Sequence, residues 1–215
     1  MKEIESSSSD CHSSHCGHSH ASLSHFSKMK HILWIAFWVN FSMFFVEVGG
    51  SFYSGSEALL ADALDFIGDA ANYLLAIFVL EKNEKTKIKM VILKGFAMIF
   101  YSFFVLLKTG YDFLYAGVPE SFSMGAIAVI ALVANVSVAA LLYAFRSNDL
   151  NMRSVWLCSR NDAIGNMAII LSAVLVYFFQ AAWPDWLVAI IMESLGLWTA
   201  KEILTSSRKA YLEVK

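Results

Sequence analysis

Apolar residues dominate six long stretches of the chain, and short polar connections separate them. A helix needs about 20 mostly apolar residues to cross the hydrocarbon core of a membrane. The six stretches reach or approach this length, and they lack the strict polar–apolar alternation that is typical of barrel strands. The pattern therefore predicts an all-α integral membrane protein with six transmembrane helices, at 31–53, 58–80, 91–116, 121–145, 154–179 and 184–204.

The positively charged residues predict how these helices are oriented. The connections near residues 53–57, 117–121 and 180–183 contain no Lys or Arg. Loops rich in Lys and Arg stay on the cytoplasmic side of a membrane. We therefore expect both termini to be cytoplasmic, because the basic residues flank the opposite ends of the helices: Lys28, Lys30, Lys82, Lys85, Lys87, Lys89, Arg146, Arg153, Arg208, Lys209 and Lys215.

The composition agrees with a membrane protein, since 58% of the residues are hydrophobic and the mean hydropathy is +0.57. We expect a flexible cytoplasmic tail at 1–27, a transmembrane domain at 28–207 and a short tail at 208–215. The first segment is rich in Ser and His and has no early apolar core, so it does not resemble a signal peptide. The net charge of −2 gives no reason to expect a nucleic-acid partner.

Two pairs of potential metal ligands lie inside the apolar stretches with the same spacing. Asp65 and Asp69 are four residues apart in the second stretch, as are Cys158 and Asp162 in the fifth. This spacing places both members of a pair on one face of a helix. Charged groups in a membrane span cost about 2.5–3.5 kcal/mol each on insertion scales, which indicates that these residues have a function. Three oxygens and one sulfur suit a tetrahedral transition-metal site; the alternatives are polar helix packing and, for Cys158, a small core residue.

Other polar residues of the same stretches extend this candidate site. Asp62 lies close to the face of Asp65, as a hydrogen-bond acceptor beside the ligands or as a further ligand. Asn166 is an alternative oxygen ligand or the donor of a hydrogen bond between helices. Glu47 and Glu193 are too short to reach the membrane surface, which indicates proton-linked, water-lined or paired positions unless their role is structural.

The N-terminal tail has the composition of a metal-binding segment. All six histidines of the chain fall within its first 31 residues. Their spacing is not that of a folded zinc module, so they would bind metal loosely, and the alternative is an incidental polar tail. The candidate residues for metal capture are Cys11, His12, His15, Cys16, His18 and His20.

The segment SGSEALLADALDFIGDAANY is similar to the second-span motif of the cation diffusion facilitator family. The segments EVGGSFYSGS and LNMRSVWLCSRNDAIGN extend this resemblance, which covers the chain from about Lys28 to Ser207. The resemblance implies a homodimer with six helices per protomer that exports divalent metal from the cytoplasm in exchange for protons. It also implies that the metal binds to paired residues on the second and fifth spans, which are here Asp65, Asp69, Cys158 and Asp162.

The chain departs from the family pattern at two places. Cys158 stands where zinc transporters of the family often carry histidine, and the cytoplasmic C-terminal domain of the family is absent from this sequence, which reads as a short form. A sulfur ligand favours zinc, cadmium or cobalt over magnesium or calcium, which prefer oxygen.

These observations together predict a proton-coupled antiporter that exports zinc, cadmium or cobalt. The metal ion, Zn²⁺ foremost, would be a transported substrate, with no cofactor and no enzymatic activity. We expect a multi-pass protein surrounded by lipid, in the plasma (inner) membrane if the source is bacterial. The alternatives are a metal sensor or assembly subunit that does not transport, and an intramembrane enzyme that uses the aspartates as acid and base. The spans contain no histidine or recognisable nucleophile to support the enzyme.

Overall fold

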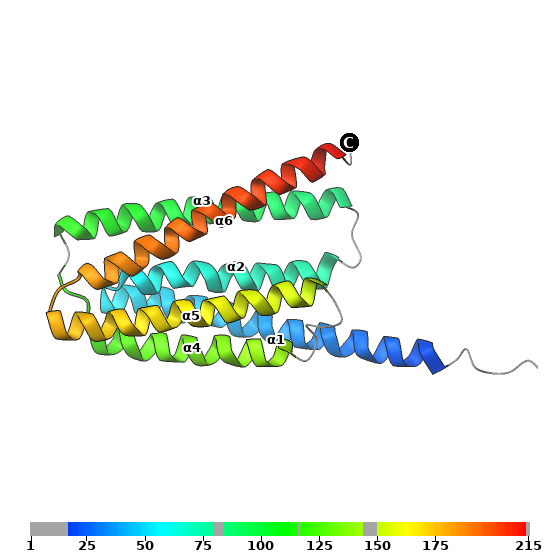
Figure 1. Cartoon of the computed structure of the whole chain (residues 1–215), viewed down its shortest axis with the longest axis horizontal. Helices are drawn as coiled ribbons and strands as arrows, with labels where there is room; N and C mark the ends of the chain where they lie inside the picture. Colours follow the sequence, from blue (N-terminus) through cyan, green and yellow to red (C-terminus); the bar gives the residue numbers. More distant parts are fainter. Residues whose placement is uncertain (1–16, 80–83, 116, 144–149, 214–215) are drawn as a thin grey trace, which may run out of the picture.

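The computed structural model folds into long antiparallel α-helices, as the hydropathy pattern predicts (Figure 1). It describes residues 17–79, 84–115, 117–143 and 150–213. No strand occurs in these four segments, so the all-α prediction is confirmed. The helices are α1 (Gly17–Ser54), α2 (Glu57–Val79), α3 (Glu84–Tyr115), α4 (Ser121–Tyr143), α5 (Leu150–Phe179) and α6 (Trp183–Glu213).

Two helices extend beyond the predicted apolar stretches. α1 begins at Gly17, inside the segment predicted as a flexible tail, and α6 continues to Glu213, past the predicted end of the membrane domain. No proline interrupts either extension, and each adds one hydrogen bond per residue to a helix that is already formed. α2 begins one residue before the predicted stretch, and the hydroxyl of Ser56 caps it by accepting a hydrogen bond from the Leu59 N–H at 3.2 Å.

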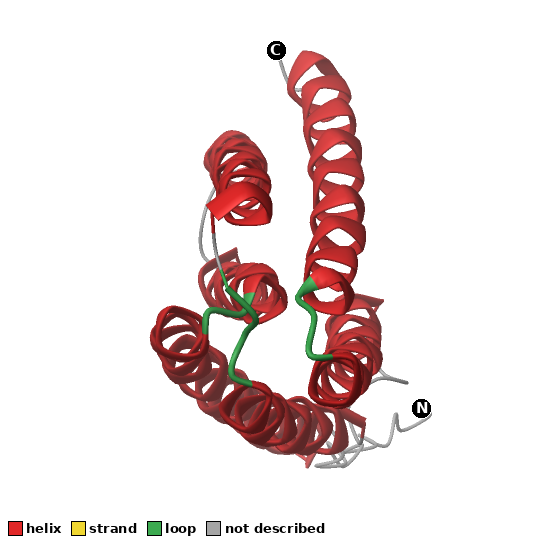
Figure 2. Cartoon of the chain, turned by 90° about the vertical axis from the view of Figure 1, so that its left-hand side faces the viewer, coloured by secondary structure: helices red, strands yellow, loops and turns green. Residues whose placement is uncertain are grey.

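The helices pack as three main pairs: α1 with α2, α4 with α5, and α3 with α6. The first two pairs form a four-helix group, because α1 also packs on α4 and α2 on α5. α3 and the C-terminal part of α6 stand above this group (Figures 1 and 2), and they touch it mainly through α2 and α5. α2 therefore occupies the centre of the molecule, in contact with α1, α3, α5 and α6.

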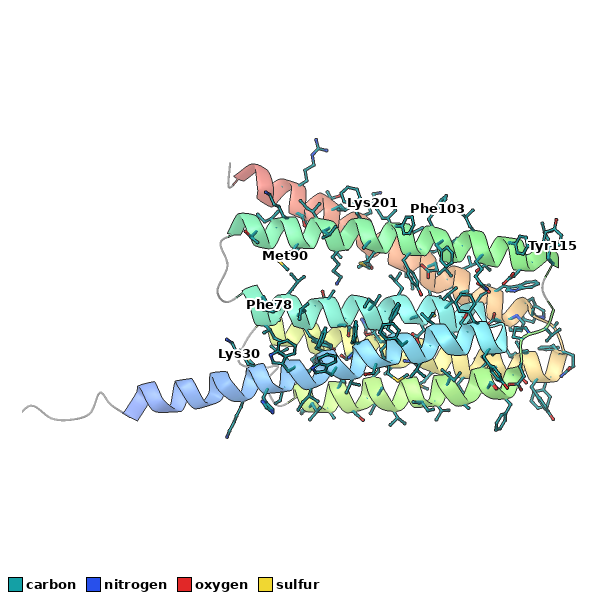
Figure 3. All side chains as sticks on the ribbon, turned by 180° about the vertical axis from the view of Figure 1, so that it is seen from behind. Lys30, Phe78, Met90, Phe103, Tyr115 and Lys201 are labelled. Atoms are coloured by element: carbon teal, nitrogen blue, oxygen red, sulfur yellow. The ribbon has the colours of Figure 1, made fainter. Side chains whose placement is uncertain are left out.

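The outer surface of the bundle is strongly apolar. Large side chains such as Phe103 and Tyr115 point away from the helices (Figure 3), with 59% and 72% of their surface exposed. Within the described residues, α1, α3, α4 and α5 are long and apolar enough to cross a membrane. α2 carries four carboxylates and does not meet that criterion, which is consistent with its central position, shielded from lipid.

Candidate metal site

The carboxylates of α2 form a strip along the helix, with Asp62, Asp65 and Asp69 separated by one turn each. Asp62 is completely buried, Asp69 is 5% exposed and Asp65 is partly buried. The strip is buried because the other helices surround α2, so its charges lie where water is scarce. Such a strip requires protons, hydrogen-bond donors or cations as partners.

α5 brings Asp162 to this strip. The carboxyl groups of Asp69 and Asp162 lie close enough to interact directly, and Asp65 is close enough to interact electrostatically with both. The structure thus brings together three of the four residues expected at the metal site. Cys158 lies in α5 one turn before Asp162, but its side chain is outside the part of the chain that the structure describes.

Asp69 also receives hydrogen bonds from α2 and α5. The hydroxyl of Tyr73 donates to its Oδ2 at 3.1 Å, and the Oγ of Ser159 donates to the same oxygen at 3.5 Å. The Tyr73 and Ser159 hydroxyls are 2.8 Å apart. These contacts fix the orientation of the carboxylate and join α2 to α5 on the side of Asp69 away from Asp65. Neither Tyr73 nor Ser159 was expected from the sequence; their positions four residues after Asp69 and three before Asp162 are the only signal.

The described side chains do not yet form a complete metal shell. No three His, Cys, Asp or Glu residues among them are placed closely enough to hold a metal ion. Asp69 and Asp162 are in contact, whereas Asp65 lies one helical turn further along α2. Mutual repulsion of the carboxylates opposes closer approach until a cation compensates their charge.

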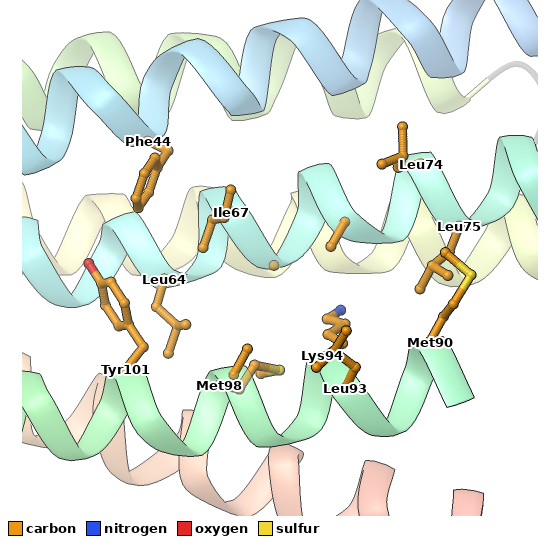
Figure 4. Close-up of a pocket in the computed structure, with 13 residues that line it drawn as sticks. Phe44, Leu64, Ile67, Leu74, Leu75, Met90, Leu93, Lys94, Met98 and Tyr101 are labelled. Carbon is orange, nitrogen blue, oxygen red and sulfur yellow. The ribbon is translucent and has the colours of Figure 1, made fainter. Parts of the chain in front are cut away.

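A lysine lies close to these carboxylates. Lys94 of α3 points toward α2 and donates a hydrogen bond to Oδ1 of Asn72 (Figure 4). Its charge acts on both Asp65 and Asp69. It is the only charged residue that lines an otherwise apolar cavity of about 390 Å³ between α2 and α3. The cavity is lined by Phe44, Leu64, Ile67, Gly68, Ala71, Leu74, Leu75, Met90, Leu93, Lys94, Ala97, Met98 and Tyr101.

Comparison with known proteins identifies the group to which this architecture belongs. The family described as the cation efflux transmembrane domain matches residues 33–213, which include all three aspartates of the site and Cys158. The chain belongs to this family. The resemblance to cation diffusion facilitators and the prediction of a multi-pass membrane protein are thereby confirmed.

Several relatives in the family are named for metal transport. A "Cadmium, cobalt and zinc/H(+)-K(+) antiporter" of Bacillus subtilis (strain 168) is 27% identical over 198 residues, which are 86% of this chain and 64% of the relative. The "Zinc transporter ZitB" of Escherichia coli (strain K12) is 28% identical over 191 residues, 83% of this chain and 61% of the relative. The "Metal cation efflux system protein CzcD" of Cupriavidus metallidurans is 28% identical over 182 residues, 78% of this chain and 57% of the relative. The chain thus spans less than two thirds of the length of these relatives.

The end of α2 that the charge pattern assigns to the outside has fully partnered carboxylates. Asp185 of α6 accepts hydrogen bonds from the Ser56 hydroxyl at 2.6 Å and from the N–H groups of Glu57 and Ala58 at 2.7 and 3.2 Å. Glu57 in turn forms an ion pair with Lys108 of α3. A carboxylate at a helix N-terminus is favoured by the exposed N–H groups and the helix dipole. This network ties α2, α3 and α6 together.

The remaining candidate residues behave differently from expectation or lie outside the description. Asn166 does not donate between helices: its Nδ2 donates to the Asp162 carbonyl of its own helix at 3.0 Å, while its Oδ1 is buried without a donor. The short side chain of Asn reaches a carbonyl one turn earlier in its own helix more easily than a group on a neighbouring helix. The proposed capture residues lie outside the described side chains: Cys11, His12, His15, Cys16, His18 and His20.

Proposed function

We propose that this protein exports divalent transition metal, zinc, cadmium or cobalt, from the cytoplasm in exchange for protons. The observation that carries the proposal is the contact of Asp69 on α2 with Asp162 on α5, beside Asp65. Three carboxylates from two helices in a buried place form a site that a divalent cation would neutralise. The names of the relatives, two of which include cadmium, cobalt or zinc and a transport activity, support the same class of substrate.

Proton exchange follows from the chemistry of the ligands. A carboxylate or thiolate must lose its proton before it coordinates a metal, so metal binding releases protons. When the site opens to the outer side, protons compete with the metal for the same groups and favour its release. We propose Asp65, Asp69 and Asp162 as ligands, with Cys158 as the fourth. Asp62 is proposed as an acceptor beside them, and Asn166 as an alternative oxygen donor.

The proposal is tested by metal flux into proteoliposomes with and without a pH gradient. Wild-type protein should accumulate zinc, and a pH gradient should change the rate. Asp162→Asn should abolish this flux, whereas Glu202→Gln, a change at an exposed carboxylate of α6, should not. Metal binding without flux in a well-inserted wild-type protein would instead support the sensor or assembly subunit.

The identity of the fourth ligand and the assembly state are separate parts of the proposal. If Cys158 is a ligand, Cys158→Ser should reduce cadmium flux more than cobalt flux, because sulfur prefers the softer ion. An unchanged ratio would remove Cys158 from the site. The homodimer implied by the family resemblance is tested by the mass of the protein in lipid nanodiscs.

A further inference from the structure

A cavity of about 430 Å³ lies between α4 and α5, at the end of these helices that the charge pattern assigns to the cytoplasm. Its lining includes Ala139 and Ala140 of α4 and Ala163 of α5, whose small side chains leave space between the two helices. Val136 and Tyr143, which also line it, are 51% and 53% exposed. The cavity therefore opens to the outer surface of the bundle, which lipid surrounds in a membrane.

Arg160 of α5 is the only charged residue that lines this cavity in the described part of the chain. Its guanidinium lies over the Trp156 ring, 5.5 Å from the ring centroid, which favours a fixed position for the charge. One N–H group donates to the side-chain oxygen of Asn161 at 3.3 Å, and among the described side chains no carboxylate pairs with Arg160. The positive charge of this exposed side chain is thus not neutralised within the protein.

The position of Arg160 along α5 places its charge near the membrane surface. The part of α5 that is long and apolar enough to cross a membrane begins at Ser159. The rings of Trp156 and Tyr143 lie beside each other here, with centroids 6.0 Å apart, and Trp and Tyr favour the level of the lipid headgroups. Along the two helices, Val136 and Ala163 lie further toward the middle of the membrane. The cavity thus has a positive charge at headgroup level and an apolar lining below it.

We propose that this cavity binds an anionic phospholipid of the cytoplasmic leaflet, with its phosphate on Arg160 and one acyl chain along the alanine lining. A guanidinium can donate two parallel hydrogen bonds to a phosphate, and basic pockets between membrane helices on the cytoplasmic side suit anionic headgroups. No carboxylate competes with the phosphate for Arg160 among the described residues, and α4 has no charged residue from Ser121 to Tyr143. The inference does not depend on the proposed transport function.

Two variants test the two parts of the site, each with a matched control. Arg160→Gln removes the charge, and Arg208→Gln makes the same change at an exposed arginine of α6. Ala140→Leu fills the cavity, and Ala168→Leu adds the same volume at an exposed alanine of α5 that does not line it. All four positions except the cavity itself face the surroundings of the bundle, so the variants are expected to fold.

The measurement is native mass spectrometry of the purified full-length protein, titrated with phosphatidylglycerol or with phosphatidylcholine of the same acyl chains. Wild type and both controls should bind one phosphatidylglycerol more tightly than phosphatidylcholine, whose headgroup has no net charge. Arg160→Gln should bind phosphatidylglycerol at least about tenfold more weakly, because a charged hydrogen bond is lost. Ala140→Leu should weaken the binding of both lipids, because the acyl chain is excluded.

Three results would overturn the lipid site. The first is equal affinity of wild type and Arg160→Gln for phosphatidylglycerol. The second is an equal loss in Arg160→Gln and Arg208→Gln, which would assign the effect to overall charge. The third is unchanged lipid affinity in Ala140→Leu together with conversion of a dimer to a monomer, because the cavity would then be an interface between two copies of the chain.

Discussion

Buried carboxylates at the outer end of α2 and in the middle of α2 have different surroundings. At the outer end both carboxylates are buried and partnered: Glu57 of α2 pairs with Lys108 of α3, and Asp185 of α6 accepts hydrogen bonds from the N-terminus of α2. In the middle, Asp62 has no donor, and Asp69 accepts hydrogen bonds from the Tyr73 and Ser159 hydroxyls beside a second carboxyl group, that of Asp162. The outer carboxylates hold helices together, and we propose that the middle ones bind and release cations.

The sharpest test of this contrast is Asp69→Asn. The amide oxygen can still accept the hydrogen bonds of Tyr73 and Ser159, so the free energy of unfolding should change by less than about 1 kcal/mol. Zinc affinity should fall by at least about 100-fold, because a charged ligand is lost. Calorimetry measures the zinc affinity, and unfolding in a mixed detergent titration measures the free energy of unfolding. A large loss of stability with normal affinity would show that Asp69 is a structural residue.

Asp185→Ala should show the reverse behaviour. It leaves three buried donors of α2 without an acceptor, namely the Ser56 hydroxyl and the N–H groups of Glu57 and Ala58. We expect a loss of about 2–4 kcal/mol in the free energy of unfolding. Zinc affinity of the folded fraction should stay within a few-fold of wild type. Strongly weakened zinc binding in folded Asp185→Ala would mean that the two ends of α2 are not independent.

Lys94→Met should have a smaller effect, and only on zinc binding near Asp65 and Asp69 in the middle of α2. Removal of a positive charge near Asp65 and Asp69 favours a divalent cation there, so zinc affinity should rise roughly three- to tenfold. Lys89→Met is the matched control, since Lys89 is an exposed lysine of the same helix. An equal change in both variants would assign the effect to overall charge rather than to the position of Lys94.

The smallest expected effect concerns Glu120, in the connection before α4. The Ser123 side chain lowers the pKa of the Glu120 carboxyl group most, followed by the N–H groups of Ser123 and Phe122, which donate to the carboxylate at 2.7 and 3.1 Å. A lowered pKa in the folded state contributes stability above the usual value of 4.5, and this contribution is lost as the pH falls below it. The unfolding midpoint of wild type should therefore decline slightly more than that of Glu120→Gln in this acidic range. Parallel curves would show that the cap contributes nothing.

The sequence predicts the helices well because apolar length depends on local composition. Each of the six expected stretches corresponds to one helix. The contact between α2 and α5 could also be anticipated. Polar residues inside membrane spans are costly, so two equally spaced polar pairs on two spans are expected to lie together. The matching of Asp69 with Asp162 follows from that reasoning.

Partners that depend on the packing of distant helices could not be predicted in this way. Nothing in the local sequence shows that Asp185 caps α2 across 127 to 129 positions of the chain, or that Lys94 reaches Asn72. The start of α1 at Gly17 was missed because a helix can extend beyond its apolar part, once formed, without any hydrophobic signal.

The position of the cavity between α2 and α3 has a mechanical consequence. Toward the outside, α3 is fastened to α2 by the Tyr101 hydroxyl on the Leu60 carbonyl and by the Lys108–Glu57 pair. Toward the other end, from Leu64 to Leu75, an open cavity of about 390 Å³ lies between the two helices, and the hydrogen bond from Lys94 to Asn72 joins them there. We expect the α3–α6 pair to swing about its fastened outer end, which would narrow or widen the opposite end and break or form that single hydrogen bond.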